Sequence, residues 1–195
     1  MIEDDYDFDF HYESSPILPL ASLQHGGQVM YVGSFSKSLA PALRLGFLVG
    51  DAGLVHQLAE VRRLIDRTGD PLLERAVSHL LKHGEIKRHF QKSLRAYRSR
   101  RDHACKLLQS ELADELSFVT PEGGMAAWVG FRRLENPDAL WQTFEKNGLS
   151  LSHPEAYDQQ GGKYTRLGFA SCTEEEITQG IFLLKKCIEL NRFGK

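Results

Sequence analysis

The sequence predicts an α/β fold in which a mostly parallel sheet precedes a long helix and a small α+β unit. Residues 28–35 and 45–50 form almost wholly apolar runs, which are typical of strands in a sheet covered on both faces. An unbroken helical pattern occupies residues 85–112, and short strand patterns follow it. We therefore expect two parts, residues 1–84 with the parallel sheet and residues 85–195 with the long helix and a small C-terminal domain.

The first part opens on a run of acidic and aromatic residues, from Glu3 to Phe10. A solvated loop or an oxygen-donor metal cluster could have this composition, but the spacing of an EF-hand is absent. A third interpretation is that Met1 and Ile2 are the end of a buried strand whose carboxyl end delivers Asp4, because functional residues collect at such ends in open α/β sheets. A start this abrupt predicts that the chain is the second half of a larger protein.

Three helices are predicted in the middle of the chain. Apolar residues at helical spacing mark residues 54–66, and Asp70 with Pro71 begins a second helix that runs to about His83. The third helix, residues 85–112, carries a set of basic residues that could contact nucleic acid: Lys87, Arg88, Lys92, Arg95, Arg98, Arg100, Arg101 and Lys106. An apolar stripe also runs along it, formed by Ile86, Phe90, Leu94, Tyr97, Ala104 and Leu108. The basic residues are therefore most simply its solvated face.

The last part alternates short strands and helices. Residues 116–120 and 125–131 are expected to pair through a Pro-Glu-Gly-Gly turn, and a helix over residues 137–147 follows. Further strands are predicted at residues 149–151 and 164–170. Thr173 with Glu176 forms a capping box that opens the final helix.

Composition and charge exclude several functions. The net charge of −2 provides no general attraction to nucleic acid, and no apolar run reaches the roughly 18–20 residues that span a bilayer. Three cysteines without a C-x-x-C pair argue against a disulfide framework or a structural zinc site and favour a reducing, cytoplasmic compartment. His79 and His83 have the spacing of a two-histidine metal site, but no glutamate or third ligand accompanies them. We interpret them as surface or packing residues and expect no metal.

The segment with the clearest chemistry runs from Gly33 to Gly46, where a predicted strand ends in Ser-x-Ser-Lys. A lysine at a strand end can be desolvated, which lowers its pKa and makes its amine a nucleophile. The hydroxyls of Ser34 and Ser36 and the guanidinium of Arg44 are donors suited to a phosphate. Taken singly, Ser34, Ser36, Lys37 and Arg44 could each be an ordinary loop or surface residue. Together they suit pyridoxal 5'-phosphate (PLP), an aldehyde that carries a phosphate.

At these motifs the chain resembles the fold-type I PLP-dependent aminotransferases. It is most similar to the aminotransferase-like effector domain of the MocR subgroup of GntR-family transcriptional regulators. The resemblance covers nearly the entire chain and corresponds to the C-terminal half of that domain. The matching motifs, in the family's order, are E-D-D-Y-D (3–7), S-K-x-x-x-P-x-x-R-x-G (36–46), G-E-I-x-R-H (84–89), P-E-G-G-M (121–125) and R-L-G-F (166–169).

The resemblance implies catalytic and cofactor-binding roles for particular residues. Lys37 forms the internal aldimine and shuttles a proton between cofactor and substrate carbons. Asp4 pairs with the protonated pyridine nitrogen, with Asp5 as the alternative one position away. Tyr6 hydrogen-bonds the phenolic oxygen of the ring. The pairing with Asp4 keeps the PLP ring an electron sink, and the bond from Tyr6 tunes the pKa of the aldimine.

The resemblance also implies how phosphate, substrate and a second subunit are bound. Ser34, Ser36 and Arg44 hold the phosphate, and Arg166 takes the substrate carboxylate by a bidentate fork, unless it forms only a structural salt bridge. A homodimer is expected, and Arg67 is a candidate contact across its interface. The family's glycine-containing phosphate loop and PLP-stacking ring cannot be located in this sequence.

Three functions remain open from the sequence. The leading hypothesis is a PLP-binding, aminotransferase-like domain fragment that senses an amino acid or another small amine for a MocR-type regulator. Such a regulator contacts DNA only through a winged-helix module that this sequence does not contain. The second hypothesis is an aminotransferase of class I/II, which exchanges amino groups between amino acids and 2-oxo acids. The third is a non-catalytic dimerisation fragment with an incomplete cofactor site.

Overall fold

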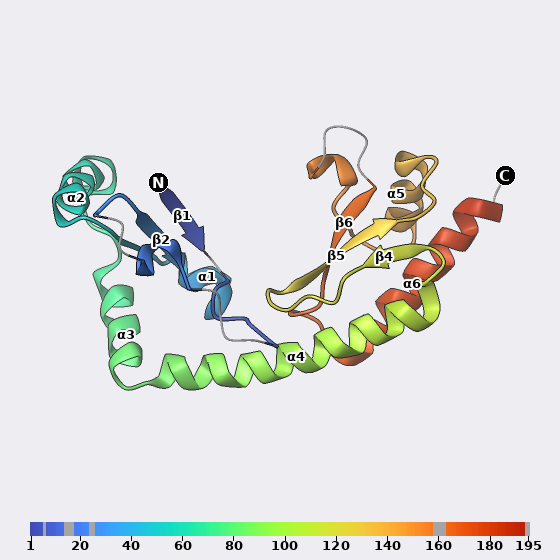
Figure 1. The fold of residues 1–195 in the computed structure, drawn as a ribbon, viewed down its shortest axis with the longest axis horizontal. Helices are drawn as coiled ribbons and strands as arrows, with labels where there is room; N and C mark the ends of the chain where they lie inside the picture. The colour runs from blue at the N-terminus through green and yellow to red at the C-terminus, as the bar shows by residue number, and fades with distance from the viewer. Residues whose placement is uncertain (6, 14–17, 24–25, 158–162, 194–195) are drawn as a thin grey trace. The chain divides into compact units, whose positions relative to one another are not determined.

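The computed structural model describes the chain except residues 6, 14–17, 24–25, 158–162 and 194–195 (Figure 1). The described residues form two compact units, Met1–Leu94 and Arg95–Lys195, which we treat separately. The long helix α4 (Glu85–Leu112) has the bounds predicted from its apolar stripe and contains the boundary between the units. The domain boundary expected at Gly84 lies at the beginning of this helix.

Unit 1 is built on a three-stranded sheet in the order β1-β2-β3, which confirms the α/β class. The strands are β1 (Ile2–Asp5), β2 (Met30–Ser34) and β3 (Gly46–Val49). β1 runs parallel to β2, and β3 runs antiparallel to it. Phe10, Tyr12 and Val29, in the connection between β1 and β2, are buried and supply apolar contacts.

The helical elements of unit 1 are short in the part of the chain that contains the strands and longer in the part that follows β3. They are η1 (Leu20–Ser22), α1 (Phe35–Ser38), η2 (Pro41–Leu43), α2 (Ala52–Asp66), α3 (Pro71–Lys82) and the first part of α4. Aspartates cap the two longer helices: Asp51 accepts from the amide of Leu54, and Asp70 accepts from the amides of Leu72 and Leu73. The helix start predicted at Asp70 and Pro71 is therefore confirmed.

Two apolar elements of unit 1 are uncovered. All four residues of β3 are exposed, although its sequence predicted a strand covered on both faces. No residue of α2 is buried, and Leu64 and Ile65 are 87% and 80% exposed. The apolar pattern thus predicted the elements correctly but not their exposure.

Unit 2 is a small α+β unit around an antiparallel sheet in the order β4-β5-β6 (Figure 1). Its elements are β4 (Leu116–Phe118), β5 (Ala126–Phe131), α5 (Pro137–Lys146), η3 (Pro154–Ala156), β6 (Tyr164–Gly168), α6 (Glu174–Phe193) and the second part of α4. The core joins the inner face of the sheet to the helices through Leu108, Leu112, Val129, Phe144 and Ile181. The predicted hairpin of β4 and β5 is confirmed.

The start of α6 has the predicted capping box. The Thr173 amide donates to Oε2 of Glu176 at 2.7 Å, and the Glu176 amide donates to Oγ1 of Thr173 at 3.2 Å. These bonds satisfy donors that the first turn of a helix leaves free. The pKa of Glu176 is lowered because two donors stabilise its charged carboxylate, first the Thr173 amide and then the Thr173 hydroxyl, which donates to Oε2 at 3.1 Å.

The strand predicted at residues 149–151 is wrong, because that segment has no strand in the structure. Its carbonyl groups are instead satisfied by side chains. The indole of Trp141 donates to the carbonyl of Leu151 at 3.0 Å, and the hydroxyl of Thr165 donates to that of Ser152 at 2.8 Å. Side-chain donors therefore hold this segment in place of a strand ladder.

The solvated face predicted for α4 is wrong for Arg101, which is only 2% exposed. Its Nη1 donates to the carbonyl of Pro121 at 2.8 Å, and its Nε donates to Oδ1 of Asp102 at 2.8 Å. The neighbouring Arg100 donates to the carbonyl of Ala170. These bonds join α4 to the loops that precede β5 and follow β6.

Candidate functional site

Lys37 lies on a short, well-held turn directly after β2. Ser34 caps this turn, its Oγ accepting from the Ser36 amide at 3.1 Å, and the Leu39 amide donates to the carbonyl of Phe35 at 2.9 Å. The buried Ser38 hydroxyl donates to the carbonyl of Ser34. Lys37 itself is exposed. A fixed turn at the end of a strand therefore presents its amine to the surface.

The loop that carries Arg44 runs beside this turn. The Phe35 amide donates to the carbonyl of Leu45 at 2.9 Å, and Ser34 is paired with Gly46 across β2 and β3. Arg44 has a φ of 50°, in the left-handed region that residues other than glycine rarely adopt. Strain of this kind persists where the surrounding structure imposes it, often at a ligand site.

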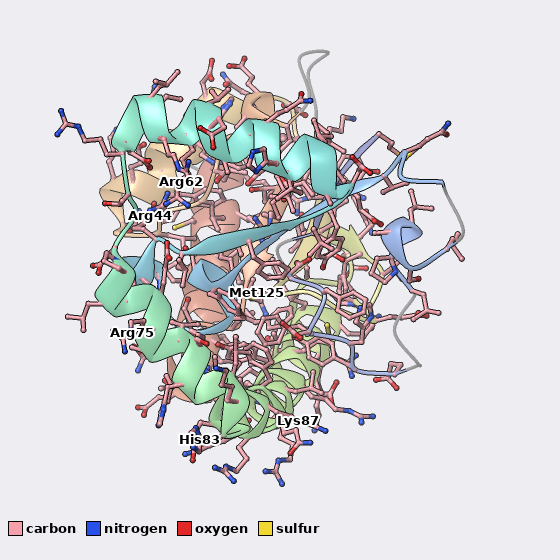
Figure 2. All side chains as sticks on the ribbon, turned by 90° about the vertical axis from the view of Figure 1, so that its left-hand side faces the viewer. Arg44, Arg62, Arg75, His83, Lys87 and Met125 are labelled. Carbon is pink, nitrogen blue, oxygen red and sulfur yellow. The ribbon has the colours of Figure 1, made fainter. Side chains whose placement is uncertain are left out.

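Arg44 borders a hollow in unit 1. It shares this hollow of about 370 Å³ with Arg62 of α2, and Figure 2 shows the two arginines on the same side of the unit. Arg62 is ion-paired with Asp66 at 3.3 Å. In the described part of the chain, neither Arg44 nor Lys37 has a carboxylate within 4.0 Å. The Arg44 guanidinium can thus bind an anion, and the Lys37 amine is accessible to an aldehyde.

The register of the parallel pair separates Asp4 from Asp5. Asp4 is opposite Val32 and shares a face of the sheet with Ser34, whereas Asp5 is opposite Gly33 on the other face. Asp5 is hydrogen-bonded to Tyr31, and burial together with the negative charge of Asp5 raises the pKa of Tyr31 to about 12. This placement supports Asp4 as the carboxylate on the Ser34 side. Tyr6, the third predicted residue of this group, lies outside the described residues.

One residue at this site, His89, was not predicted to be a site residue, although it ends the matching motif at residues 84–89. Nε2 of His89, on α4, lies 3.1 Å from the carbonyl of Ser38 and therefore donates to it. The Ser93 hydroxyl lies 3.4 Å from the same nitrogen. His89 thus holds the last turn of α1, adjacent to Lys37, although 51 residues separate the two bonded partners.

Arg166 belongs to unit 2, whereas the other predicted site residues belong to unit 1. It is exposed on β6, directly opposite Trp128 of β5. In the part of unit 2 that is described, no carboxylate lies within ion-pair distance of Arg166, so the structural salt bridge considered for it is not found. Its guanidinium is available to an anion.

A cavity of about 320 Å³ lies beside β6. Its walls are mainly apolar residues of α4 and α6, such as Leu108 and Ile181. Residues 166–169, from β6 and the loop after it, also line the cavity, as does Ala127 of β5.

The remaining titratable residues do not form a metal site. The rings of His79 and His83 stack with centroids 4.0 Å apart, and Nδ1 of His83 lies 2.8 Å from the carbonyl of His79. Within the described ranges, no group of three or more His, Cys, Asp or Glu side chains could hold a metal ion. Cys105, Cys172 and Cys187 are free thiols. No helix of the described chain is long and apolar enough to cross a membrane.

Comparison with known proteins identifies both regulators and enzymes. The chain is 27% identical to the HTH-type transcriptional regulator YdfD of Bacillus subtilis, over 94% of this chain and 38% of that protein. It is 28% identical to the probable rhizopine catabolism regulatory protein MocR of Rhizobium meliloti, over 95% of this chain and 38% of that protein. It therefore spans less than half the length of these relatives.

Solved structures agree with the fold. The Pyrococcus horikoshii kynurenine aminotransferase, crystallised with PMP, superposes with a TM-score of 0.88 and 26% identity, over 96% of this chain and 47% of that one. The family model for aminotransferase class I and II matches residues 7–182, which include Lys37, Arg44 and Arg166. This chain is a member of the class I and II aminotransferase family, with the fold of the PLP-dependent aminotransferases.

Proposed function

We propose that this chain is the PLP-binding, aminotransferase-like part of a MocR-type transcriptional regulator, in which Lys37 supplies the amine that bonds to the cofactor. The observation that supports it most directly is the capped turn after β2, which exposes Lys37 close in the chain to Arg44, a cation that has no carboxylate partner among the described residues. The cofactor chemistry rests on this geometry, and the regulatory role rests on the relatives.

The residues present fit PLP. Hydroxyls of Ser34 and Ser36 with the guanidinium of Arg44 provide donors for the phosphate, and Asp4 provides a carboxylate for the pyridine nitrogen. When bound, PLP supplies an electrophilic aldehyde and an electron-accepting ring. We assign Tyr6 to the phenolic oxygen on the resemblance alone.

Each of these side chains has a defined task. The Lys37 amine acts as a nucleophile and afterwards accepts and returns a proton at Nζ. Asp4 keeps a proton on the nitrogen with which it pairs. Arg166 binds the carboxylate of an amino acid by two parallel N–H···O bonds, which fixes the direction of the ligand. We propose a homodimer, with Arg67 at the subunit contact, and a cytoplasmic location consistent with free thiols.

An aminotransferase is the second candidate, because the kynurenine aminotransferase shares the fold at 26% identity. Both candidates use the same residues and differ in turnover. A sensor completes at most half of a transfer and turns over slowly, whereas an enzyme exchanges amino groups rapidly with a 2-oxo acid. DNA binding belongs to a module that this chain does not contain. A non-catalytic dimerisation fragment is the third candidate and requires no role for Lys37.

The experiment that tests the cofactor proposal is a PLP titration of this chain followed by absorbance. We expect a yellow absorbance band, and we expect sodium borohydride to attach the cofactor permanently to one peptide, which contains Lys37. Lys37→Ala should abolish both the band and the labelled peptide. Lys92→Ala removes another exposed lysine and serves as the control. Equal labelling of the Lys37→Ala variant would show that the cofactor reacts with surface lysines, and the proposal would fail.

A further inference from the structure

Unit 2 carries an ordered group of exposed aromatic side chains. The rings of Trp128 and Tyr164 are parallel, with an interplanar angle of 2° and centroids 5.7 Å apart. Tyr157 meets the same indole edge-on at 5.1 Å. These rings are 42–45% exposed, whereas Trp141, the other tryptophan of the chain, is 5% exposed. We call Trp128, Tyr157 and Tyr164 the aromatic group.

The sheet is built to hold this group. Trp128 and Tyr164 lie on the outer face, because Val129 and Thr165 between them in the register point inward and are fully buried. Gly130 is opposite Tyr164, and a Cβ at Gly130 would lie 2.6 Å from the tyrosine ring. The absence of a side chain there lets the Tyr164 ring lie across the strand towards the indole. The stacking therefore depends on this glycine.

Arg166 stands on the same face. It is directly opposite Trp128 and follows Tyr164 by two residues, so its Cβ lies about 5 Å from that of Trp128. A cation without a described carboxylate partner is thus next to exposed aromatic rings. An anion bound by Arg166 would hold an attached side chain within reach of these rings.

We infer that the aromatic group determines ligand specificity, selecting a carboxylate that carries an aromatic side chain. The inference rests on the proposed role of Arg166 as the carboxylate anchor. An aromatic ring placed edge-on or offset against Trp128 gains affinity beyond the burial of its area, by about two- to tenfold. An aliphatic side chain of the same size buries similar area without this gain.

The test measures binding without PLP, so that it is independent of Lys37. The probe is 3-phenylpropionate, compared with 3-cyclohexylpropionate, which lacks the aromatic ring, and with 3-phenylpropionamide, which lacks the charge. Binding is followed by the indole NMR signal of Trp128, assigned with Trp128→Phe. The variants Trp128→Leu and Tyr164→Leu each remove one ring of the aromatic group, and Arg166→Gln removes the charge that binds the carboxylate. In Trp128→Leu, where the indole is absent, binding is followed by ligand-induced NMR shifts of buried methyl groups. Phe182→Leu, which removes a 48% exposed ring from α6, is the control.

We expect 3-phenylpropionate to bind about two- to tenfold more tightly than the cyclohexyl acid and to outbind the amide. Trp128→Leu or Tyr164→Leu should reduce the preference for the aromatic acid, Arg166→Gln should weaken both acids, and Phe182→Leu should change neither. Equal binding of the two acids, or of acid and amide, would overturn the inference. So would self-association of the chain that Trp128→Leu abolishes, because a second copy would then be the occupant. If the chain prefers the aromatic acid but does not bind PLP, only the cofactor proposal is refuted.

Discussion

The pKa values of Tyr31 and Asp5, two hydrogen-bonded neighbours in the sheet of unit 1, are both raised, first of all by burial. Burial raises the pKa of Asp5, and the nearby charges of Asp7 and Glu3 raise it further. The pKa of Tyr31 rises to about 12, first through burial and then through the charge of Asp5. Burial thus disfavours the charged form of each group, and the negative charge of Asp5 further disfavours the phenolate of Tyr31.

We predict that Asp5→Asn lowers the pKa of Tyr31 part of the way towards its ordinary value of about 10, because burial remains after the charge is removed. The pKa is measured from the ultraviolet absorbance of the phenolate as a function of pH. The Tyr31→Phe variant identifies which transition belongs to Tyr31. The folded pKa is above the unfolded one, so stability from neutral Tyr31 is complete below about pH 10 and declines as pH rises to about 12. An unchanged titration in Asp5→Asn would contradict the coupling.

Arg101 is the buried charge of unit 2, and its replacement is predicted to destabilise that unit. Arg101→Met leaves the carbonyl of Pro121 without its donor, which costs about 1–3 kcal/mol. Asp102 is 55% exposed and can be solvated instead. Urea unfolding of the chain measures the effect, and Lys106→Met, on the exposed side of α4, should change stability by less than about 0.5 kcal/mol. Equal effects of the two variants would rule out a special role for Arg101.

The position of Arg101 could have been predicted from the sequence. It stands three residues before Ala104 and seven before Leu108, so helical periodicity places it on the apolar stripe. A basic residue within an apolar stripe indicates a buried, hydrogen-bonded charge. The contact of His89 with Ser38 gave no such signal, because only the tertiary fold brings the two together.

At the scale of elements, α4 is predicted to stabilise α1 through His89. His89→Ala removes the donor to the Ser38 carbonyl, so the Leu39 amide of α1 should exchange with solvent roughly fivefold faster, equivalent to about 1 kcal/mol. His89→Gln keeps an N–H donor and should exchange more nearly like the original chain. His56→Ala, on an exposed face of α2, is the control. Unaltered exchange in His89→Ala would exclude this role.

The longest periodic element was predicted to the residue, whereas one of the short strands was predicted wrongly. The bounds of α4 were correct because its apolar stripe extends over many turns. The strand at residues 149–151 was wrong, because so short an apolar run is compatible with any extended segment. What decided its conformation were donors elsewhere in unit 2, the indole of Trp141 and the hydroxyl of Thr165.

The candidate site was predictable in part for a related reason. Ser34, Lys37 and Arg44 lie within one short segment, so local sequence contained their grouping. The separation of Asp4 from Asp5 required the register of β1 on β2, which depends on distant residues. The aromatic group also required register, because Trp128 and Tyr164 are far apart in the chain.

At the scale of the whole molecule, the uncovered apolar residues are predicted to drive self-association. Replacing the highly exposed pair on α2 by Leu64→Lys and Ile65→Glu removes apolar surface without changing the net charge. We expect the variant to remain monomeric at several-fold higher concentration, as measured by sedimentation velocity. Val119→Lys, at an 84% exposed position of unit 2, is the control. Equal association of all three proteins would locate the contact elsewhere.

The register of β5 on β6 also has a consequence for the time course of synthesis. Ala126 pairs with Gly168, which follows it by 42 residues. At roughly 5–20 residues per second, a ribosome adds that length in about 2–8 s. The β4–β5 hairpin is then complete but has an open edge, and Trp128 has no Tyr164 to stack on. In this interval the edge of β5 that later pairs with β6 is open, and the arrival of β6 covers it and brings Arg166 opposite Trp128.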